Sequence, residues 1–125
     1  MKALALVALG GALGSVARYL LSGWVLQLAP AARFPWGTFT VNVVGCLVAG
    51  LAAGYLLRGD ALGADARVFV FAGLLGGFTT FSAFGVETVA LLRKGEVLVA
   101  GLNVAGSVAV ALAALWLGMA IAQRG

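Results

Sequence analysis

The chain has little charge, no histidine and a single cysteine among its 125 residues. Charged residues make up only 10% of it, whereas a soluble domain carries about a quarter. So few charges cannot supply a water-facing surface. Because Cys46 stands alone in an apolar run, an intrachain disulfide is excluded, and a His/Cys metal site or a Cys-His nucleophile is disfavoured. The chain also lacks paired carboxylates, a Ser-His-Asp set and a phosphate loop, so we expect no enzyme.

Apolar residues are abundant, at 63% of the chain, and the mean hydropathy is +1.12. This composition predicts an all-α, multi-pass integral membrane protein in contact with lipid. At about 20 residues per span there is room for about four helices in one domain, residues 1–125. The net charge of +4 comes mainly from arginines near the expected helix ends and from no large basic cluster. That pattern suits anchoring at lipid headgroups and disfavours nucleic-acid binding.

Uncharged runs give the expected positions of the four spans. They are residues 3 into the twenties, 36–57, 68–92 and 97–123, with loops at 29–37, 58–67 and 93–96. Two GxxxG pairs, Gly10 with Gly14 and Gly50 with Gly54, have the spacing that lets another helix approach closely.

Lysine and arginine are balanced between the two sides that these spans predict. One side has Lys2, Arg58, Arg67 and Arg124, and the other has Arg33, Arg93 and Lys94, with Arg18 near the far end of the first span. The difference in Lys and Arg count between the two sides sets the orientation of a protein in the membrane. A balanced count therefore favours neither orientation. We hypothesise that it inserts in both orientations and pairs antiparallel with itself, as a dual-topology homodimer.

The stretch Gly76–Glu87, GGFTTFSAFGVE, is predicted to break the third span near its middle. Glycine costs roughly 1 kcal/mol in a helix interior, and threonine and serine compete for backbone hydrogen bonds. In a membrane such a break needs protein or a water-filled cavity to satisfy the freed backbone groups. Carbonyls at Gly76, Gly77 and Thr79 could coordinate a hard cation such as sodium. Alternatively, the glycines only allow helices to cross closely.

Two helical pairs of polar residues interrupt the apolar spans, Thr38 with Asn42 and Asn103 with Ser107. They either hydrogen-bond between helices, at around 0.6 to 2 kcal/mol each, or form a polar track for a solute. Both interpretations remain open from the residues alone.

Aromatic and charged residues near the break give further candidates. Phe81, Phe84 and Glu87 follow at steps of three and share a helix face. Two phenylalanines at this spacing either pack or turn their positive ring edges toward an anion. Arg18 and Glu87 are the charges expected nearest to membrane depth, so each is a vestibule or pore-mouth candidate, with plain anchoring as the alternative.

Four motifs together make the chain resemble the CrcB/Fluc family of fluoride channels over essentially its whole length. They are GGALGSVARY at 10–19, PWGTFTVNVVG at 35–45, GGFTTFSAF at 76–84 with Glu87 behind it, and LNVAGS at 102–107. The third is specific when it is combined with the asparagine of the second span and the four-helix length.

The resemblance implies a dual-topology homodimer of four-helix subunits with two pores. It would lie in the cell inner (plasma) membrane, export fluoride passively and so protect the cell from it. By position, the resemblance implies a pore lined by Asn42, Phe81, Phe84 and Ser107. Arg18 would lie at the vestibule and Glu87 near the pore entrance. A structural sodium ion would be held at the dimer interface by carbonyls of Gly76 and Thr79 from both subunits.

Some positions depart from the family pattern. Asn103 stands where some members have a tyrosine, Ala111 where a hydroxyl can occur, and the motif reads FSAF where many members read FSTF. The possible polar track, Thr38, Thr80 and Asn103, therefore has a variable end.

The alternative to a fluoride channel is a small dual-topology multidrug or cation exporter, for which Glu87 is the only candidate carboxylate. A third interpretation is a structural or assembly subunit, which leaves the polar sites unexplained.

Overall fold

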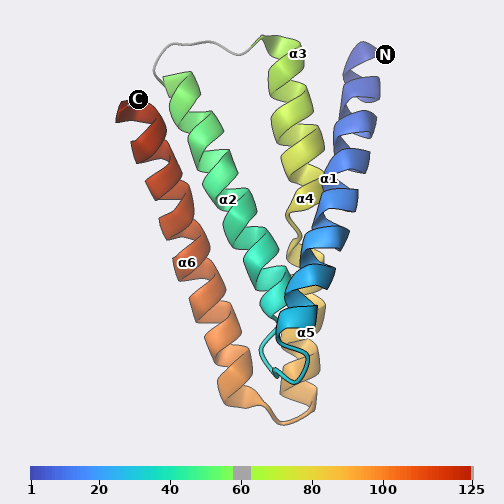
Figure 1. The fold of residues 1–125 in the computed structure, drawn as a ribbon, viewed down its shortest axis with the longest axis vertical. Coiled ribbons are helices and arrows are strands. Elements are labelled where there is room, and N and C mark those ends of the chain that lie inside the picture. The colour runs from blue at the N-terminus through green and yellow to red at the C-terminus, as the bar shows by residue number, and fades with distance from the viewer. Residues whose placement is uncertain (58–62, 125) are drawn as a thin grey trace.

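The computed structural model describes residues 1–57 and 63–124, and all regular structure among them is helical. The elements are α1 (Lys2–Leu28), α2 (Trp36–Leu57), α3 (Ala64–Arg67), η1 (Val68–Leu75), α4 (Gly76–Phe78), α5 (Phe81–Arg93) and α6 (Val97–Arg124). Because α3, η1, α4 and α5 follow one another along one span, the described residues form four helices long and apolar enough to cross a membrane. Figure 1 shows both termini at the same end of the molecule.

The predicted spans agree with this arrangement except at the start of the third. That span begins at Ala64, so residues 64–67 of the expected loop are helical. The rest of that loop, with Arg58, lies outside the described residues. The π-helical winding of η1 was also not predicted from the sequence.

The two glycine pairs let neighbouring helices approach to backbone contact. A Cβ atom at Gly14 would collide with the Leu74 carbonyl oxygen, and one at Gly10 would lie 2.8 Å from the Phe69 carbonyl oxygen. On the other side of the molecule, Gly50 of α2 faces the backbone of Leu115 in α6 in the same way. The close approach that the GxxxG spacing predicts is therefore confirmed for both pairs, as α1 packs on η1 and α4, and α2 packs on α6.

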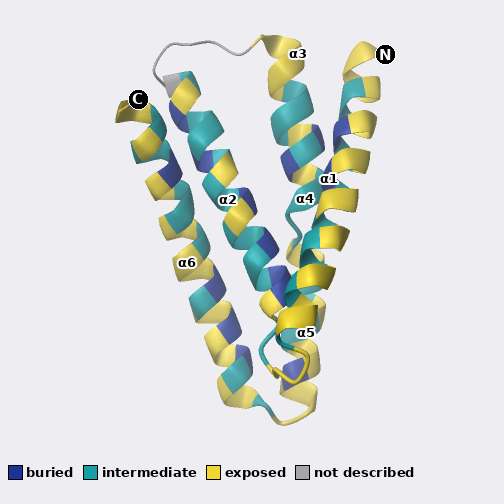
Figure 2. Cartoon of the chain, viewed as in Figure 1, coloured by how far each residue is buried: buried dark blue, intermediate teal, exposed yellow. Residues whose placement is uncertain are grey.

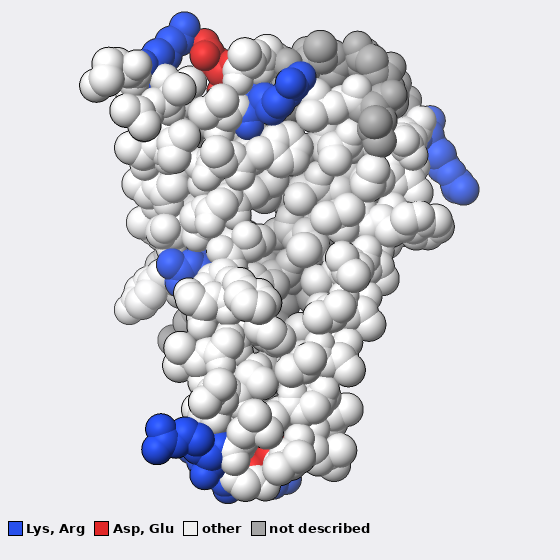
Figure 3. All heavy atoms as spheres, turned by 180° about the vertical axis from the view of Figure 1, so that it is seen from behind, with Lys and Arg blue, Asp and Glu red and all other residues white. Residues whose placement is uncertain are grey.

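Little of the chain is buried, as a lipid-facing protein requires. Figure 2 shows buried and intermediate positions on the sides of the helices that face one another, and exposed positions on the outer sides. Many of the exposed residues are large and hydrophobic, such as Leu4, Leu20 and Trp116. Figure 3 shows Lys, Arg, Asp and Glu gathered mainly at the two ends of an otherwise uncharged surface, which is hollowed at mid-height. Apart from one Lys or Arg side chain at mid-height, this distribution leaves a band without charged side chains on the face shown, as the hydrocarbon core of a bilayer requires.

Candidate functional site

The third span is interrupted at two residues, Thr79 and Thr80. Thr79 has φ −83° and ψ 152°, and Thr80 has φ −148° and ψ 118°, so the backbone is extended there. The helix restarts at Phe81 because the Thr80 hydroxyl accepts a hydrogen bond from the Ala83 amide at 3.2 Å, which is an N-cap. The glycines Gly76 and Gly77, by contrast, are still helical. The predicted break is confirmed, and it falls just after the glycines.

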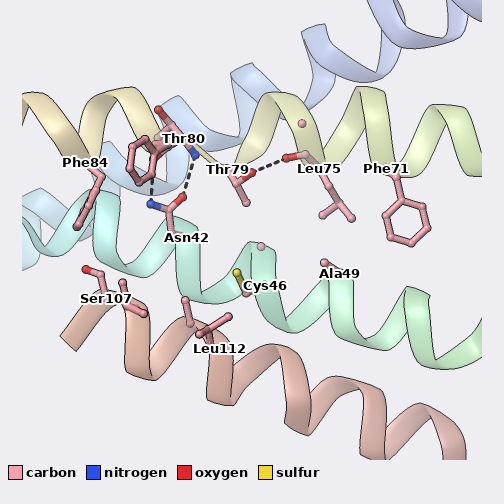
Figure 4. A pocket seen from close by; sticks show the side chains of 15 residues that line it. Asn42, Cys46, Ala49, Phe71, Leu75, Thr79, Thr80, Phe84, Ser107 and Leu112 are labelled. Carbon is pink, nitrogen blue, oxygen red and sulfur yellow. Dashed lines mark hydrogen bonds between the residues drawn. The ribbon is translucent and has the colours of Figure 1, made fainter. Parts of the chain in front are cut away.

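Asn42 of α2 hydrogen-bonds to the backbone at this break. Its Oδ1 accepts a hydrogen bond from the Thr80 amide at 2.8 Å, and its Nδ2 donates to the Thr80 carbonyl at 3.0 Å (Figure 4). Both backbone groups that the extended residue cannot pair within a helix are thereby satisfied by one side chain. Since an unpaired buried amide or carbonyl costs about 1 to 3 kcal/mol, Asn42 makes the extended backbone tolerable at membrane depth.

The same contacts release two carbonyls from helical hydrogen bonding. The Thr80 amide would be the i+4 partner of the Gly76 carbonyl, but it donates to Asn42. The Ala83 amide would be the partner of the Thr79 carbonyl, but it donates to the Thr80 hydroxyl. Gly76 and Thr79 both line a central cavity between α2, the broken span and α6, which is described below. Their carbonyl oxygens are the kind of hard ligand that a sodium ion takes where a membrane helix is broken.

A third carbonyl near the break, that of Gly77, has an unexpected partner. It accepts a hydrogen bond from Arg18 Nε at 3.2 Å. Arg18 lies midway along α1 and is half-buried, so a cation sits at the carboxyl-terminal end of α4, where the backbone carbonyls point. The sequence identified Arg18 as a charge near membrane depth but not its contact with Gly77.

A cavity of about 450 Å³ lies between α2, the broken span and α6. Four of its lining residues are the predicted pore residues Asn42, Phe81, Phe84 and Ser107. The two rings contact each other with their centroids 5.5 Å apart and their planes at 43°. Phe81 is 82% exposed, so its ring lies at the open side of the cavity. Most of the remaining lining is apolar, which leaves these polar groups and ring edges as the points of contact for a polar solute.

Behind Phe84, a line of hydrogen bonds joins α6 to α5. Ser107 Oγ donates to Asn103 Oδ1 at 3.0 Å, and Asn103 Nδ2 donates to Thr88 Oγ1 at 2.9 Å. Thr88 Oγ1 in turn donates to the Phe84 carbonyl at 2.7 Å. Asn103 and Ser107 lie on one face of α6, as their i, i+4 spacing predicted, and both are buried. Thr88 was missed because a single threonine in an apolar helix gives no signal until its partner helix is placed.

Glu87 and Thr38 also meet, although they belong to different helices. Thr38 Oγ1 donates to Glu87 Oε2 at 2.9 Å, and Thr38 is buried. The other carboxylate oxygen, Oε1, is buried and has no hydrogen-bond partner among the described residues. Within residues 1–57 and 63–124, no group of three or more His, Cys, Asp or Glu side chains could hold a metal ion.

These features define a class of protein: an integral membrane protein of four helices whose broken third span faces a small, mostly apolar cavity at membrane depth. Pockets of this kind fix a ligand with a few convergent polar groups.

Comparison with known proteins identifies the family. The chain belongs to the family described as "CrcB-like protein, Camphor Resistance (CrcB)", whose profile matches residues 5–119. Over 118 residues it is 52% identical to a protein of Methylobacillus flagellatus, covering 94% of this chain and 92% of that one. It is 46% identical over 124 residues to a protein of Geobacter metallireducens, covering 99% of each. Both relatives are named "Fluoride-specific ion channel FluC".

Proposed function

We propose that this protein is a fluoride-specific ion channel that lets fluoride leave the cell passively and so protects against fluoride toxicity. The observation that carries the proposal is the meeting of Asn42, Phe81, Phe84 and Ser107 in one cavity. The similarity of the chain, over nearly its full length, to proteins named as fluoride channels supports the same function. A channel family also agrees with the expectation that the chain is not an enzyme.

Fluoride is small and strongly hydrated, so several donors must replace its water at once. The Asn42 amide has two N–H groups and uses one on the Thr80 carbonyl, which leaves one for an anion. The Ser107 hydroxyl can rotate away from Asn103 to donate to the ion. The ring edges of Phe81 and Phe84 add positive potential without a formal charge. Such weak, multiple contacts attract an ion without trapping it.

Residues on either side of the cavity complete the proposed path. The possible polar track includes Thr38, Thr80 and Asn103, which hydrogen-bond to Glu87, to the Ala83 amide and to Thr88 respectively. Glu87 is assigned to the pore entrance and Arg18 to the vestibule. Arg18 also donates a hydrogen bond to the Gly77 carbonyl, and this contact beside the break supports the assignment.

The proposed working unit is an antiparallel homodimer of two such single-domain chains, residues 1–125, in opposite orientations. The balanced lysine and arginine count supports it. So does the exposure of Phe81 and Gly76 beside the break, because a second copy would cover them. Gly76 and Thr79 would hold a structural sodium ion between the two copies, and the bound ion would supply the positive charge that fixes their carbonyl oxygens. Fusions of reporters to the C-terminus should place that end on both sides of the membrane; finding it on one side only contradicts the dimer.

Fluoride efflux from liposomes tests the channel. Purified protein should release fluoride, detected by an electrode, and should release neither chloride nor a lipophilic cation at a comparable rate. Release of the cation instead, abolished in Glu87→Gln, would favour the alternative of a small multidrug or cation exporter. No fluoride release at all would refute the channel.

Replacement of the cavity phenylalanines tests the site. Phe81→Ile and Phe84→Ile should each lower fluoride efflux by about tenfold or more, which corresponds to a loss of roughly 1.4 kcal/mol at the barrier, while the protein stays folded. Phe71→Ile is a matched control, because Phe71 lines the same cavity outside the motif. Unchanged efflux in both test variants would rule out the assigned pore.

A further inference from the structure

A second groove, of about 490 Å³, lies at the end of the molecule that carries the first loop. One wall consists of Phe34, Trp36 and Phe39, and the other consists of residues of α6, from Val99 to Gly106. At a rise of about 1.5 Å per residue, the α6 wall runs about 10 Å into the membrane. The groove therefore starts at the interface and points along the direction of lipid chains.

The three aromatic rings of the first wall brace one another. Phe34 and Trp36 have ring centroids 4.5 Å apart, and the ring of Phe39 meets both edge-on, at 5.4 Å and 5.6 Å. Trp36 is 41% exposed. Tryptophan at a membrane interface places its apolar ring among lipid chains and its N–H near the headgroups. We therefore expect this wall of three aromatic rings to lie at headgroup depth.

Arg33 stands at the mouth of the groove and retains free donor capacity. Its Nη1 donates to both oxygens of Glu96, at 3.1 Å and 3.0 Å, and its side chain is 73% exposed. A guanidinium has five N–H groups, so Nε and Nη2 can still fork onto a phosphate. The exposed residues Arg93 and Lys94 belong to the same end, where basic residues outnumber Glu96.

The groove lies on the other side of α6 from the central cavity. Gly106 lines the groove and Val108 lines the cavity. Side chains two positions apart on a helix point about 200° away from each other, so Gly106 and Val108 lie on nearly opposite sides of α6. Under the proposed dimer the cavity side faces the second copy. The groove then faces lipid.

We propose that this groove is a binding site for an anionic glycerophospholipid of the surrounding leaflet. One acyl chain lies between the aromatic wall and α6, and the headgroup phosphate takes the free N–H groups of Arg33. An anionic headgroup is favoured over a zwitterionic one because it adds no ammonium group to this basic end. This inference depends on the chain crossing a membrane and on the dimer's orientation, but not on fluoride conduction.

Tryptophan quenching measures the occupancy of the groove. Trp24→Phe and Trp116→Phe leave Trp36 as the only reporter. The protein is placed in phosphatidylcholine vesicles containing either brominated phosphatidylglycerol or, at the same mole fraction, brominated phosphatidylcholine. Phosphatidylglycerol should quench Trp36 more strongly, with a binding preference of about fivefold, equal to about 1 kcal/mol for one basic residue near a charged lipid. Equal quenching by the two lipids overturns the proposal.

Two pairs of variants separate the phosphate contact from general effects. Arg33→Gln should abolish the preference, whereas Glu96→Gln breaks the same ion pair and should keep it. Gly106→Leu fills the groove and should reduce quenching by both lipids, whereas Gly23→Leu, another glycine with open space around its Cβ position, should not. A preference that survives Arg33→Gln, or equal behaviour of the two leucine variants, counts against the site. Fluoride efflux from the same vesicles should be retained throughout, and its absence would contradict the channel rather than the lipid site.

Discussion

The two halves of the broken third span are held in place by different forces. The first half, η1 and α4, packs against α1 at backbone distance, where the glycines of α1 face its carbonyls. The second half, α5, has far fewer neighbours in α2 and α6. It is tied to them by side-chain hydrogen bonds, from Asn42 to Thr80, from Thr38 to Glu87 and from Asn103 to Thr88.

The difference matches what a membrane offers as driving force. Lipid tails are as apolar as leucine, so helices associate through close van der Waals packing of small residues or through polar contacts. The first half is held by close packing. The second half uses polar contacts and presents the phenylalanines. We expect damage to the first half to impair assembly and damage to the second to impair conduction.

The largest effect is expected from filling the glycine contact of the first half. Gly14→Leu puts a side chain against the Leu74 carbonyl, which belongs to the backbone and cannot rotate away. Overpacking of this kind costs on the order of 3 kcal/mol, so thermal unfolding in detergent should occur at a markedly lower temperature. Gly11→Leu is the control, because nothing lies within 4 Å of its Cβ position. Equal melting temperatures for both variants would show that the contact does not hold α1 to the third span.

A smaller loss of stability, with a loss of conduction, is expected at the junction of the two halves. Asn42→Ala leaves the Thr80 amide and carbonyl without their partner, at a cost of about 2 kcal/mol, and removes a proposed fluoride donor. Fluoride efflux should fall by about tenfold or more. Cys46→Ala, one turn later and lining the same cavity, should leave efflux near its original rate. Normal efflux in Asn42→Ala would mean that the asparagine only shapes the backbone.

The smallest effect is expected at Arg18, whose side chain makes the one polar contact to α4 found among residues 1–57 and 63–124. Arg18→Gln weakens the hydrogen bond to the Gly77 carbonyl and should lower stability by about 1 kcal/mol, because the arginine is only half-buried. Arg18→Lys keeps the charge and should recover part of this loss, while Arg93→Gln, at an exposed position, should change nothing. Thermal unfolding of the three variants is the measurement. If glutamine and lysine behave alike at position 18, charge at the end of α4 has no role.

Much of the fold and some of the site could be predicted from the sequence. The span limits followed from uncharged runs, and the break followed from the clustering of Gly76, Gly77, Thr79 and Thr80. The exact position of the break did not follow, because glycine is tolerated within a membrane helix when a neighbour packs on it, and Gly77 packs on Gly11. The helical start at Ala64 was not predicted, because the charged and glycine-containing segment 58–67 has a composition typical of a loop.

The sequence by itself determined that this is a four-helix membrane protein of the CrcB family with a broken third span, because apolar runs, charge placement and the four motifs are local properties of the chain. Only the tertiary structure decided which groups satisfy the break. Whether Asn42 pairs with Thr80, and whether Arg18 reaches Gly77, depends on residues from separate helices lying at the same depth. Hydrogen bonds act over about 3 Å, and no pattern along one helix fixes the position of its neighbour to that precision.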